Sequence, residues 1–402
     1  MSRLLFLVLA LTWTGGAWAQ ALTGLARIDA EASVVRDTHG GAELALVLSQ
    51  PVPYRVFTLD APPRLVLDFS EVDWTGLSPE AFDRAEAVSA VAVGTIRPGW
   101  SRMVLELAEP LAVREVSMAT DTDAVVTLAL QTVAAEVFAA ASGAPDSALF
   151  RLPRPVVDLT APRRRPTGDR PVVVALDPGH GGIDPGAERD GVAEADLMLG
   201  FASELREVLI RAGFEVVLTR DADVFVPLEM RQSLARAGGA DVFLSLHADA
   251  LAEGRASGAT IYTLAQTASD IASEKLAERH DRADLLAGVD LSDQDDVVAG
   301  VLMDLARLET APRSDRLADA LVDGLKRNIG RLHKRPRLEA AFSVLKAADI
   351  PSVLIELGFL SSERDLANLV SPEWRAKAAL GIRDALLAWA AEDAAEAALL
   401  RQ

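Results

Sequence analysis

Three apolar runs of the 402-residue sequence lead directly into side chains that can bind a metal ion or transfer a proton. They are residues 172–176, which precede Asp177-Pro178-Gly179-His180-Gly181-Gly182, residues 242–246, which precede His247-Ala248-Asp249, and residues 352–355, which precede Glu356. Ligands of open α/β sheets bind beyond the carboxyl ends of the strands, so we expect these three ends to meet at one crevice. The sequence contains no cysteine, which excludes thiol catalysis and disulfides and restricts any metal site to histidine and carboxylate ligands.

The placement of His180 and His247 at matching strand ends favours metal binding, but the spacing leaves the third ligand open. Four carboxylates follow His180 closely and could complete the site: Asp184, Glu188, Glu194 and Asp196. A carboxylate directly after four apolar strand residues favours a catalytic role for Glu356. The other histidines have simpler interpretations, with His39 and His280 expected as solvated loop side chains and His333 expected at a helix end.

The elements that would position these residues alternate between strand and helix from residue 171 onward. A continuous apolar run such as residues 172–176 is typical of a strand buried on both faces. The pattern then predicts a helix at 194–212, a strand at 214–218, a helix at 228–237 and a strand at 242–246. Residues 171–395 are therefore predicted to form an α/β domain with a mainly parallel sheet flanked by helices.

The region before this domain has a different pattern. Residues 20–135 alternate between apolar and polar side chains and predict a small all-β sandwich, with strands at 42–48, 64–69, 101–107 and 124–130. No grouping of catalytic residue types occurs there, so a binding role is expected. Residues 136–170 are predicted to be a linker, because their second half is rich in proline and arginine.

The N-terminus and the overall charge indicate where the protein works and what it does not bind. Residues 1–19 combine Arg3, an apolar run too short to span a membrane and the small-residue site Ala17-Trp18-Ala19, so they predict a cleaved export signal. No later run predicts a transmembrane segment. The 59 acidic and 40 basic residues give a net charge of −19, which argues against a nucleic-acid partner.

Four sequence blocks in residues 171–390 resemble the zinc-dependent N-acetylmuramoyl-L-alanine amidases, especially the periplasmic enzymes that cleave peptidoglycan during cell division. The blocks occur in the family's order: Leu176-Asp177-Pro178-Gly179-His180-Gly181-Gly182 with Asp184-Pro185-Gly186-Ala187, Leu218-Thr219-Arg220-Asp221, Ser245-Leu246-His247-Ala248-Asp249, and Ile355-Glu356-Leu357-Gly358-Phe359-Leu360. By this resemblance one Zn²⁺ is bound by His180, Glu194 and His247, and Glu356 is catalytic. Ser362 departs from the asparagine common in the family. Residues 20–135 resemble the AMIN domain, which targets exported enzymes to the cell wall.

The implied ligand set agrees with hydrolysis at a metal ion. Two imidazoles and one carboxylate leave zinc an open coordination position, as in catalytic rather than structural sites. Zinc lowers the pKa of bound water to about 7 and polarises a carbonyl group. Glu356 would accept the proton of the water and pass it to the leaving amine. The substrate implied by the resemblance is the amide between N-acetylmuramic acid and L-alanine, and no G-x-S-x-G motif supports an acyl-enzyme route.

A long insertion at about residues 265–310 separates a predicted strand at 259–264 from a helix expected to begin near Ser314. It resembles the insertion of division-associated amidases, in which a helix covers the zinc until an activator with a LytM-type domain displaces it. Asp270, Glu274 and Glu278 recur every four residues and would share one helix face, so one of them could be an inhibitory zinc ligand. A solvated acidic face is the alternative.

Two other hypotheses for the whole chain remain at this point. One is a wall-binding regulatory protein whose active site has decayed, which the presence of both histidines, Glu194 and Glu356 argues against. The other is a zinc peptidase that acts on a different wall amide, which would use the same metal chemistry.

Overall fold

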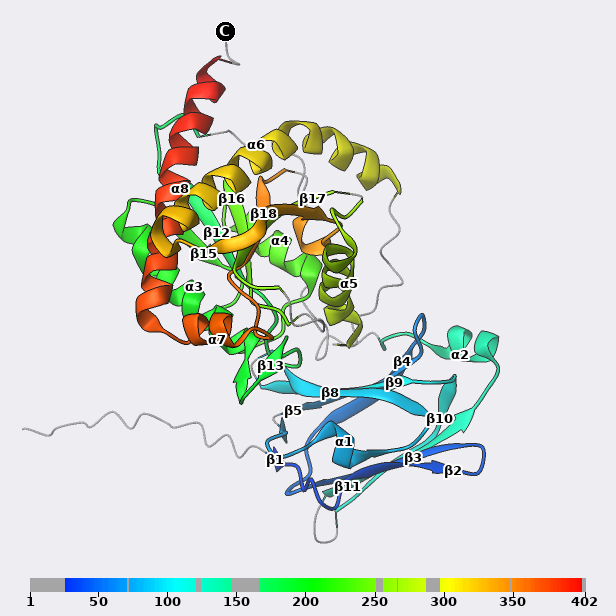
Figure 1. Ribbon diagram of the computed structural model, residues 1–402. Helices are drawn as coiled ribbons and strands as arrows, with labels where there is room; N and C mark the ends of the chain where they lie inside the picture. Colours follow the sequence, from blue (N-terminus) through cyan, green and yellow to red (C-terminus); the bar gives the residue numbers. More distant parts are fainter. Residues whose placement is uncertain are drawn as a thin grey trace, which may run out of the picture.

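The computed structural model describes residues 26–70, 72–97, 99–120, 124–145, 166–250, 256–265, 267–286, 297–346 and 349–399. The predicted export signal, residues 1–19, lies outside the described residues. An all-β domain precedes an α/β domain, as Figure 1 shows. Within the described ranges, no helix is long and apolar enough to cross a membrane.

The N-terminal domain is a sandwich of two sheets with a few short accessory elements, and the strands are antiparallel except for β7, which is parallel to β2. The five-stranded sheet has the order β10 (Leu111–Ala119), β11 (Ala124–Thr132), β3 (Gly41–Leu48), β2 (Val34–Thr38) and β7 (Asp83–Arg84). The four-stranded sheet has the order β4 (Tyr54–Leu59), β5 (Arg64–Ser70), β9 (Trp100–Leu107) and β8 (Val88–Arg97). The remaining elements are β1 (Ala26–Arg27), its parallel partner β6 (Val72–Asp73), and the short helix α1 (Pro79–Phe82).

Alternation along the strands places one face of each sheet in the shared core. In β11, for example, every second side chain from Ala124 to Leu130 is buried, because successive side chains of a strand point to opposite faces. The four strands predicted from this alternation correspond to β3, β5, β9 and β11. Helix α2 (Ala135–Ala141) adds Phe138, which is 1% exposed, to the same core. The first residues of the predicted linker therefore pack on the sandwich, whereas residues 146–165 lie outside the described part.

The α/β domain contains a six-stranded mixed sheet, and the predicted fold class is confirmed. Its order is β15 (Glu215–Leu218), β12 (Val173–Pro178), β16 (Val242–His247), β19 (Ser352–Glu356), β17 (Ala259–Leu264) and β18 (Leu332–Ala340). The first four strands are parallel to one another, β17 is antiparallel to β19, and β18 is parallel to β17. The sheet is thus mainly, but not purely, parallel.

Helices cover both faces of this sheet. The core on one face includes Val174 and Leu176 of β12, and it is completed by α3 (Glu194–Arg211), α6 (Val297–Ile329) and α8 (Pro372–Leu399). The core on the other face includes Val173 and Ala175, with α4 (Leu228–Ala237), α5 (Ile271–Leu286) and the 3₁₀ turn η1 (Ser343–Leu345). Figure 1 shows these two groups of helices on opposite sides of the strands. A hairpin of β13 (Glu188–Arg189) and β14 (Val192–Ala193) precedes α3, and α7 (Glu363–Leu369) follows β19.

Three expectations for the α/β domain differ from the structure or are resolved by it. The helix expected to begin near Ser314 begins at Val297 instead and contains Pro312 in its interior, although proline usually occupies the first turn. His333 lies at the start of β18 rather than at a helix end. Helix α8 continues to Leu399, so the stretch after Ala390 extends the last helix.

Candidate metal centre

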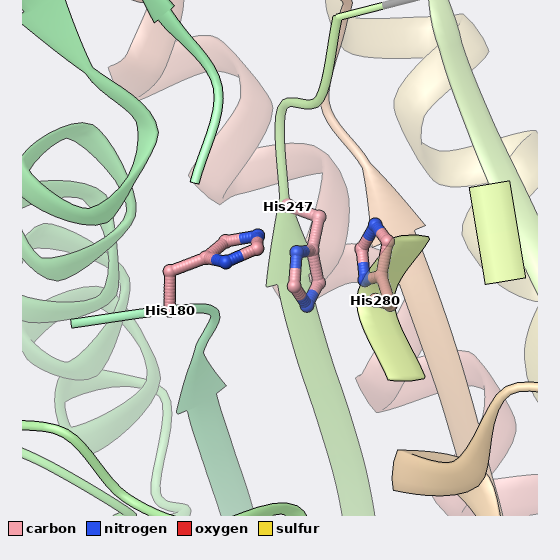
Figure 2. Close-up of side chains that lie close together, drawn as sticks. All are labelled: His180, His247 and His280. Carbon is pink, nitrogen blue, oxygen red and sulfur yellow. The ribbon is translucent and has the colours of Figure 1, made fainter. Parts of the chain in front are cut away.

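The site lies where β12, β16 and β19 end. The parallel register places Asp177 beside Ser245, and His247 beside Glu356. His180 follows β12 and faces His247, with ring centroids 5.0 Å apart. A third ring, that of His280 on α5, lies 4.1 Å from the ring of His247, as Figure 2 shows. One nitrogen from each of the three rings lies within 4.8 Å of the other two. The predicted convergence of the strand ends is therefore present.

Glu194, the first residue of α3, is the carboxylate that contacts both strand-end histidines. Its Oε1 atom lies 3.4 Å from His180 Nε2 and 3.1 Å from His247 Nδ1, and its side chain is fully buried. The backbone N–H groups of Ala248 and Ala187 donate to Oε1 and Oε2, at 2.8 and 3.0 Å. Of the other carboxylates left open by the spacing, Glu188 and Asp196 are exposed on the surface.

Asp184 fixes the orientation of His180 from outside the site. Its Oδ2 lies 2.7 Å from His180 Nδ1 and, as a carboxylate oxygen, accepts the Nδ1 proton. Buried His180 Nε2 has no hydrogen-bond partner in the described part of the chain, so its lone pair points into the site. A carboxylate that orients a histidine in this way is typical of metal centres.

A hydroxyl group fixes the tautomer of His247 in the same manner. Ser245 Oγ donates its single proton to Asp177 Oδ2 at 2.7 Å, so toward His247 Nε2, at 3.2 Å, it acts as acceptor. His247 therefore carries its proton on Nε2 and presents the Nδ1 lone pair to Glu194. Burial and the neighbouring His280 lower the pKa of His247 to about 3, which keeps this imidazole neutral.

These assignments bring three electron-pair donors together. They are His180 Nε2, Glu194 Oε1 and His247 Nδ1. The assigned ring protons of both histidines lie on the nitrogens that point away from these donors. Burial opposes charge on His180, but the carboxylates of Glu194 and Asp184 outweigh it and raise the pKa of this imidazole well above the usual value. Metal ions compete with protons for such sites. The donor set, two imidazoles and one carboxylate, fits a catalytic divalent metal ion with an open coordination position.

Two buried arginines hold the backbone that presents His180. Arg220 donates to the carbonyls of Pro178 and Gly179, and Arg231 donates to those of Pro178 and His180. Gly179 allows the strand end to approach the second histidine, because a Cβ atom at this position would lie 2.2 Å from the His247 ring. Neither arginine was singled out from the sequence as a site residue, although Arg220 lies in a quoted block.

Glu356 is placed to exchange a proton. Its Oε2 accepts the backbone N–H of Asp249 at 3.1 Å, while the buried Oε1 has no partner among the described atoms. Burial, followed by the charges of Glu194 and Asp249, raises the pKa of Glu356 well above its usual value. A buried carboxyl group with a raised pKa is a candidate for general acid and base catalysis.

His280 is a side chain of this site that the sequence analysis missed, and the expectation of a solvated loop residue is wrong. It lies on α5 with 3% of its surface exposed, and its Nε2 lies 3.5 Å from Asp249 Oδ2 and 3.7 Å from Glu356 Oε1. His39, by contrast, is exposed as expected. The signal for His280 was helical spacing, because the buried residues Ser273, Leu276, Ala277 and His280 repeat with the period of one helix face.

The three acidic residues predicted as inhibitory ligands do not face the metal site. Glu274 and Glu278 lie on the exposed side of α5. Asp270 precedes the helix, where it accepts from the backbone N–H of Ser273 at 2.9 Å and pairs with Arg335 at 3.0 Å. The alternative of a solvated acidic face agrees with the structure at Glu274 and Glu278. Among the α5 side chains that the structure describes, His280 and Arg279 reach the site, and the Arg279 guanidinium group bonds Asp249 at 2.6 Å.

The geometry defines a class of protein, a hydrolase built on an α/β sheet with a histidine and carboxylate metal centre. A family model described as N-acetylmuramoyl-L-alanine amidase matches residues 174–388, and a model of the AMIN domain matches residues 32–130. The chain belongs to the N-acetylmuramoyl-L-alanine amidase family. The predicted resemblance, enzyme class and peptidoglycan amidase function are thereby confirmed.

Two curated relatives agree with this membership. The chain is 33% identical over 362 residues to N-acetylmuramoyl-L-alanine amidase AmiC of Neisseria meningitidis, covering 86% of each protein. It is 37% identical over 230 residues to AmiA of Escherichia coli, covering 57% of this chain and 79% of that one. Among solved structures, AmiC2 of Nostoc punctiforme aligns with a TM-score of 0.39 and 25% identity over 54% of this chain and 96% of that chain.

Proposed function

We propose that this amidase hydrolyses the bond between N-acetylmuramic acid and L-alanine in peptidoglycan at a zinc ion bound by His180, Glu194 and His247. The observation that carries the proposal is the convergence of three donor atoms, one from each of His180, Glu194 and His247. Asp184 and Ser245 bind the ring N–H groups of the two histidines on the side away from these atoms. When bound there, zinc supplies a Lewis acid for the scissile carbonyl and makes water more acidic.

Glu356 is the proton carrier in this proposal. Its free Oε1 atom accepts a proton from the attacking water and then donates it to the departing amine of L-alanine. The Asp249 N–H group holds Oε2, so the carboxyl group presents only one oxygen to the reaction. Burial and the neighbouring carboxylates Glu194 and Asp249 raise the pKa of Glu356, which favours holding the proton between the two steps. The same residues would serve a zinc peptidase, so the bond that is cut must be measured.

We propose that helix α5 restrains the enzyme. The helix places His280 against the rings of His180 and His247, where an incoming carbonyl group has to approach. Leu276 and Ala277 anchor the helix in the core on that face of the sheet. We propose that a partner with a LytM-type domain displaces α5, and that His280, rather than Asp270, Glu274 or Glu278, is the side chain that occupies the open side of the metal.

The proposed place of action is the periplasm, and the proposed purpose is separation of daughter cells. The export signal predicted at residues 1–19 and the location of the peptidoglycan substrate outside the cytoplasm support export. The AMIN match supports a targeting role for the N-terminal domain. Residues 20–135, 136–170 and 171–395 are the proposed targeting domain, linker and catalytic domain, with the regulatory insertion at about 265–310.

The test is digestion of purified peptidoglycan by the zinc-loaded mature chain, with products identified by mass spectrometry. We expect stem peptides that begin with a free L-alanine amine, in larger amount from a His280→Ala variant than from the unchanged chain. Glu278→Ala on the exposed side of α5 is the matched control and should behave like the unchanged chain. Products cleaved within the stem peptide would support a zinc peptidase instead. No products from any zinc-loaded, folded variant would contradict both the amidase and the peptidase hypotheses.

A further inference from the structure

The N-terminal domain contacts the metal-binding loop of the amidase domain. A small apolar cluster joins the outer face of the sheet β4-β5-β9-β8 to two residues of the amidase domain, Ile183 and Phe225. Both are nearly buried, with 3% and 4% of their surfaces exposed. Figure 1 shows β8 on the side of the sandwich that faces the amidase domain, next to β13. Ile183 lies between His180 and Asp184, so this contact falls on the loop that presents a proposed zinc ligand.

The two domains meet backbone to backbone at this point. A Cβ atom added to Gly94 of β8 would lie 2.3 Å from Ile183 Cα, and one added to Gly182 would lie 1.9 Å from the carbonyl oxygen of Thr95. The same Thr95 carbonyl accepts the backbone N–H of Phe225 at 3.3 Å. Only glycine leaves room for so close an approach. The contact is therefore specific to these residues.

The loop is in a conformation that requires external support. His180 has a φ angle of +59°, which is unfavourable for a residue with a side chain, and Gly181 and Gly182 also have positive φ angles. A left-handed residue other than glycine is strained and persists only where its surroundings hold it. On the amidase side, Arg231 holds the His180 carbonyl and Asp223 accepts the Gly182 N–H at 2.7 Å. Strand β8 covers the remaining side, at Gly182 and Ile183.

The contact also continues into the site itself. Phe225, which packs on the N-terminal sheet, lines the small cavity at the metal centre together with His180 and His247. On the loop, Ile183 is followed by Asp184, whose carboxylate orients His180. A displacement of the N-terminal domain would thus release the loop from one side and free both Asp184 and Phe225 to move.

We infer that residues 94–96 of β8 are positioning residues of the metal centre, which hold the loop 181–184 so that Asp184 orients His180 for zinc. This inference rests on the proposed zinc site. It gives the N-terminal domain a second role beside targeting, because docking of that domain strengthens metal binding in the other. The role depends on geometry alone, since Gly94 and Thr95 touch neither the metal position nor a substrate.

The test is a Gly94→Ala substitution in the full mature chain. The added methyl group has no room against Ile183, while a strand accepts alanine without strain, so the variant separates the domains and leaves each one folded. Zinc affinity, measured by competition with a chromophoric chelator, should fall about tenfold, the lower end of the range for residues that orient metal ligands. Hydrogen exchange at the amides of residues 181–186 should become faster in the same variant.

Gly200→Ala is the matched control, because Gly200 lies on α3 with open space where the methyl group would sit. A second variant, Ile96→Ala, weakens the apolar cluster by truncation rather than by collision and should lower zinc affinity in the same direction. Zinc binding and exchange rates that are the same in Gly94→Ala, Ile96→Ala and Gly200→Ala overturn this inference alone. If the unchanged folded chain binds no zinc, the proposed function fails and this inference fails with it.

Discussion

The two sides of the metal centre are held in different ways. On the sheet side, each proposed ligand is fixed by hydrogen bonds: by the half-buried Asp184 for His180, by the buried Ser245 for His247, and by two backbone N–H groups for Glu194. On the α5 side, Arg279 bonds Asp249 while 47% of its side chain is exposed. His280 Nε2 is buried without a hydrogen-bond partner in the described residues.

This difference separates a permanent part of the site from a removable one. Hydrogen bonds between buried polar groups hold the side chains that they join rigidly. Half-exposed ion pairs contribute little, about 0–1 kcal/mol. The ligands are therefore preorganised by the sheet, and the cover can leave without disturbing them. Substitutions on the two sides should have opposite effects. Those on the sheet side should lower kcat or zinc affinity, and those on the α5 side should raise the activity measured without an activator.

The largest effect is expected for Glu356→Gln, which keeps the shape of the side chain and removes its ability to accept a proton. A positioned general base contributes about 10²–10⁴-fold to a rate, so kcat of an activated enzyme should fall by that factor. Zinc content should remain that of the unchanged chain, because Glu356 is not a proposed ligand. Glu363→Gln, at a side chain that is 93% exposed, serves as control. A fall in kcat of less than tenfold would contradict the assigned role.

The sequence was sufficient to predict the part of the site that lies on the sheet. His180, His247 and Glu356 follow apolar runs, and the parallel register fixes where such strand ends meet. The long-range partners could not be predicted in this way. Ser245 and Asp177 are 68 residues apart, and Asp177 and Arg231 are 54 residues apart, so only the folded sheet brings them together.

Prediction failed on the α5 side because the acidic repeat dominated the interpretation of the insertion. A four-residue repeat of carboxylates identifies one face of a helix but does not show which face is buried. The apolar residues Leu276 and Ala277 determine the buried face, and His280 lies on it. Similarly, the contact of β8 with the loop 181–184 depends on domain docking, which strand periodicity does not encode.

A smaller effect is expected for Ser245→Ala on the sheet side. The substitution removes the hydroxyl group that fixes the His247 tautomer and that connects His247 to Asp177 by hydrogen bonds. Loss of such an outer partner typically weakens metal affinity by about 10–100-fold. Isothermal titration with zinc measures this change, and Ser203→Ala, at an exposed helix position, is the matched control. Equal affinities for the two variants would show that Ser245 does not orient the ligand.

The smallest effect is expected for Arg279→Ala on the α5 side, and it has the opposite sign. In the Arg279–Asp249 ion pair the Arg279 side chain is 47% exposed while Asp249 is buried, so removal of the solvent-screened guanidinium group should weaken attachment of the helix by about 1 kcal/mol. That free energy corresponds to about a fivefold larger population of uncovered sites, and activity measured without an activator should rise by up to this factor. Lys275→Ala removes an exposed cation from the same helix and should leave the activity unchanged.

Because Asp249 also holds the Glu356 carboxylate through its backbone N–H, the zinc affinity and the pH dependence of the activated enzyme should stay the same in Arg279→Ala. A fall in activity would mean that Arg279 supports the catalytic side of the site and that the boundary between the fixed and removable parts lies elsewhere.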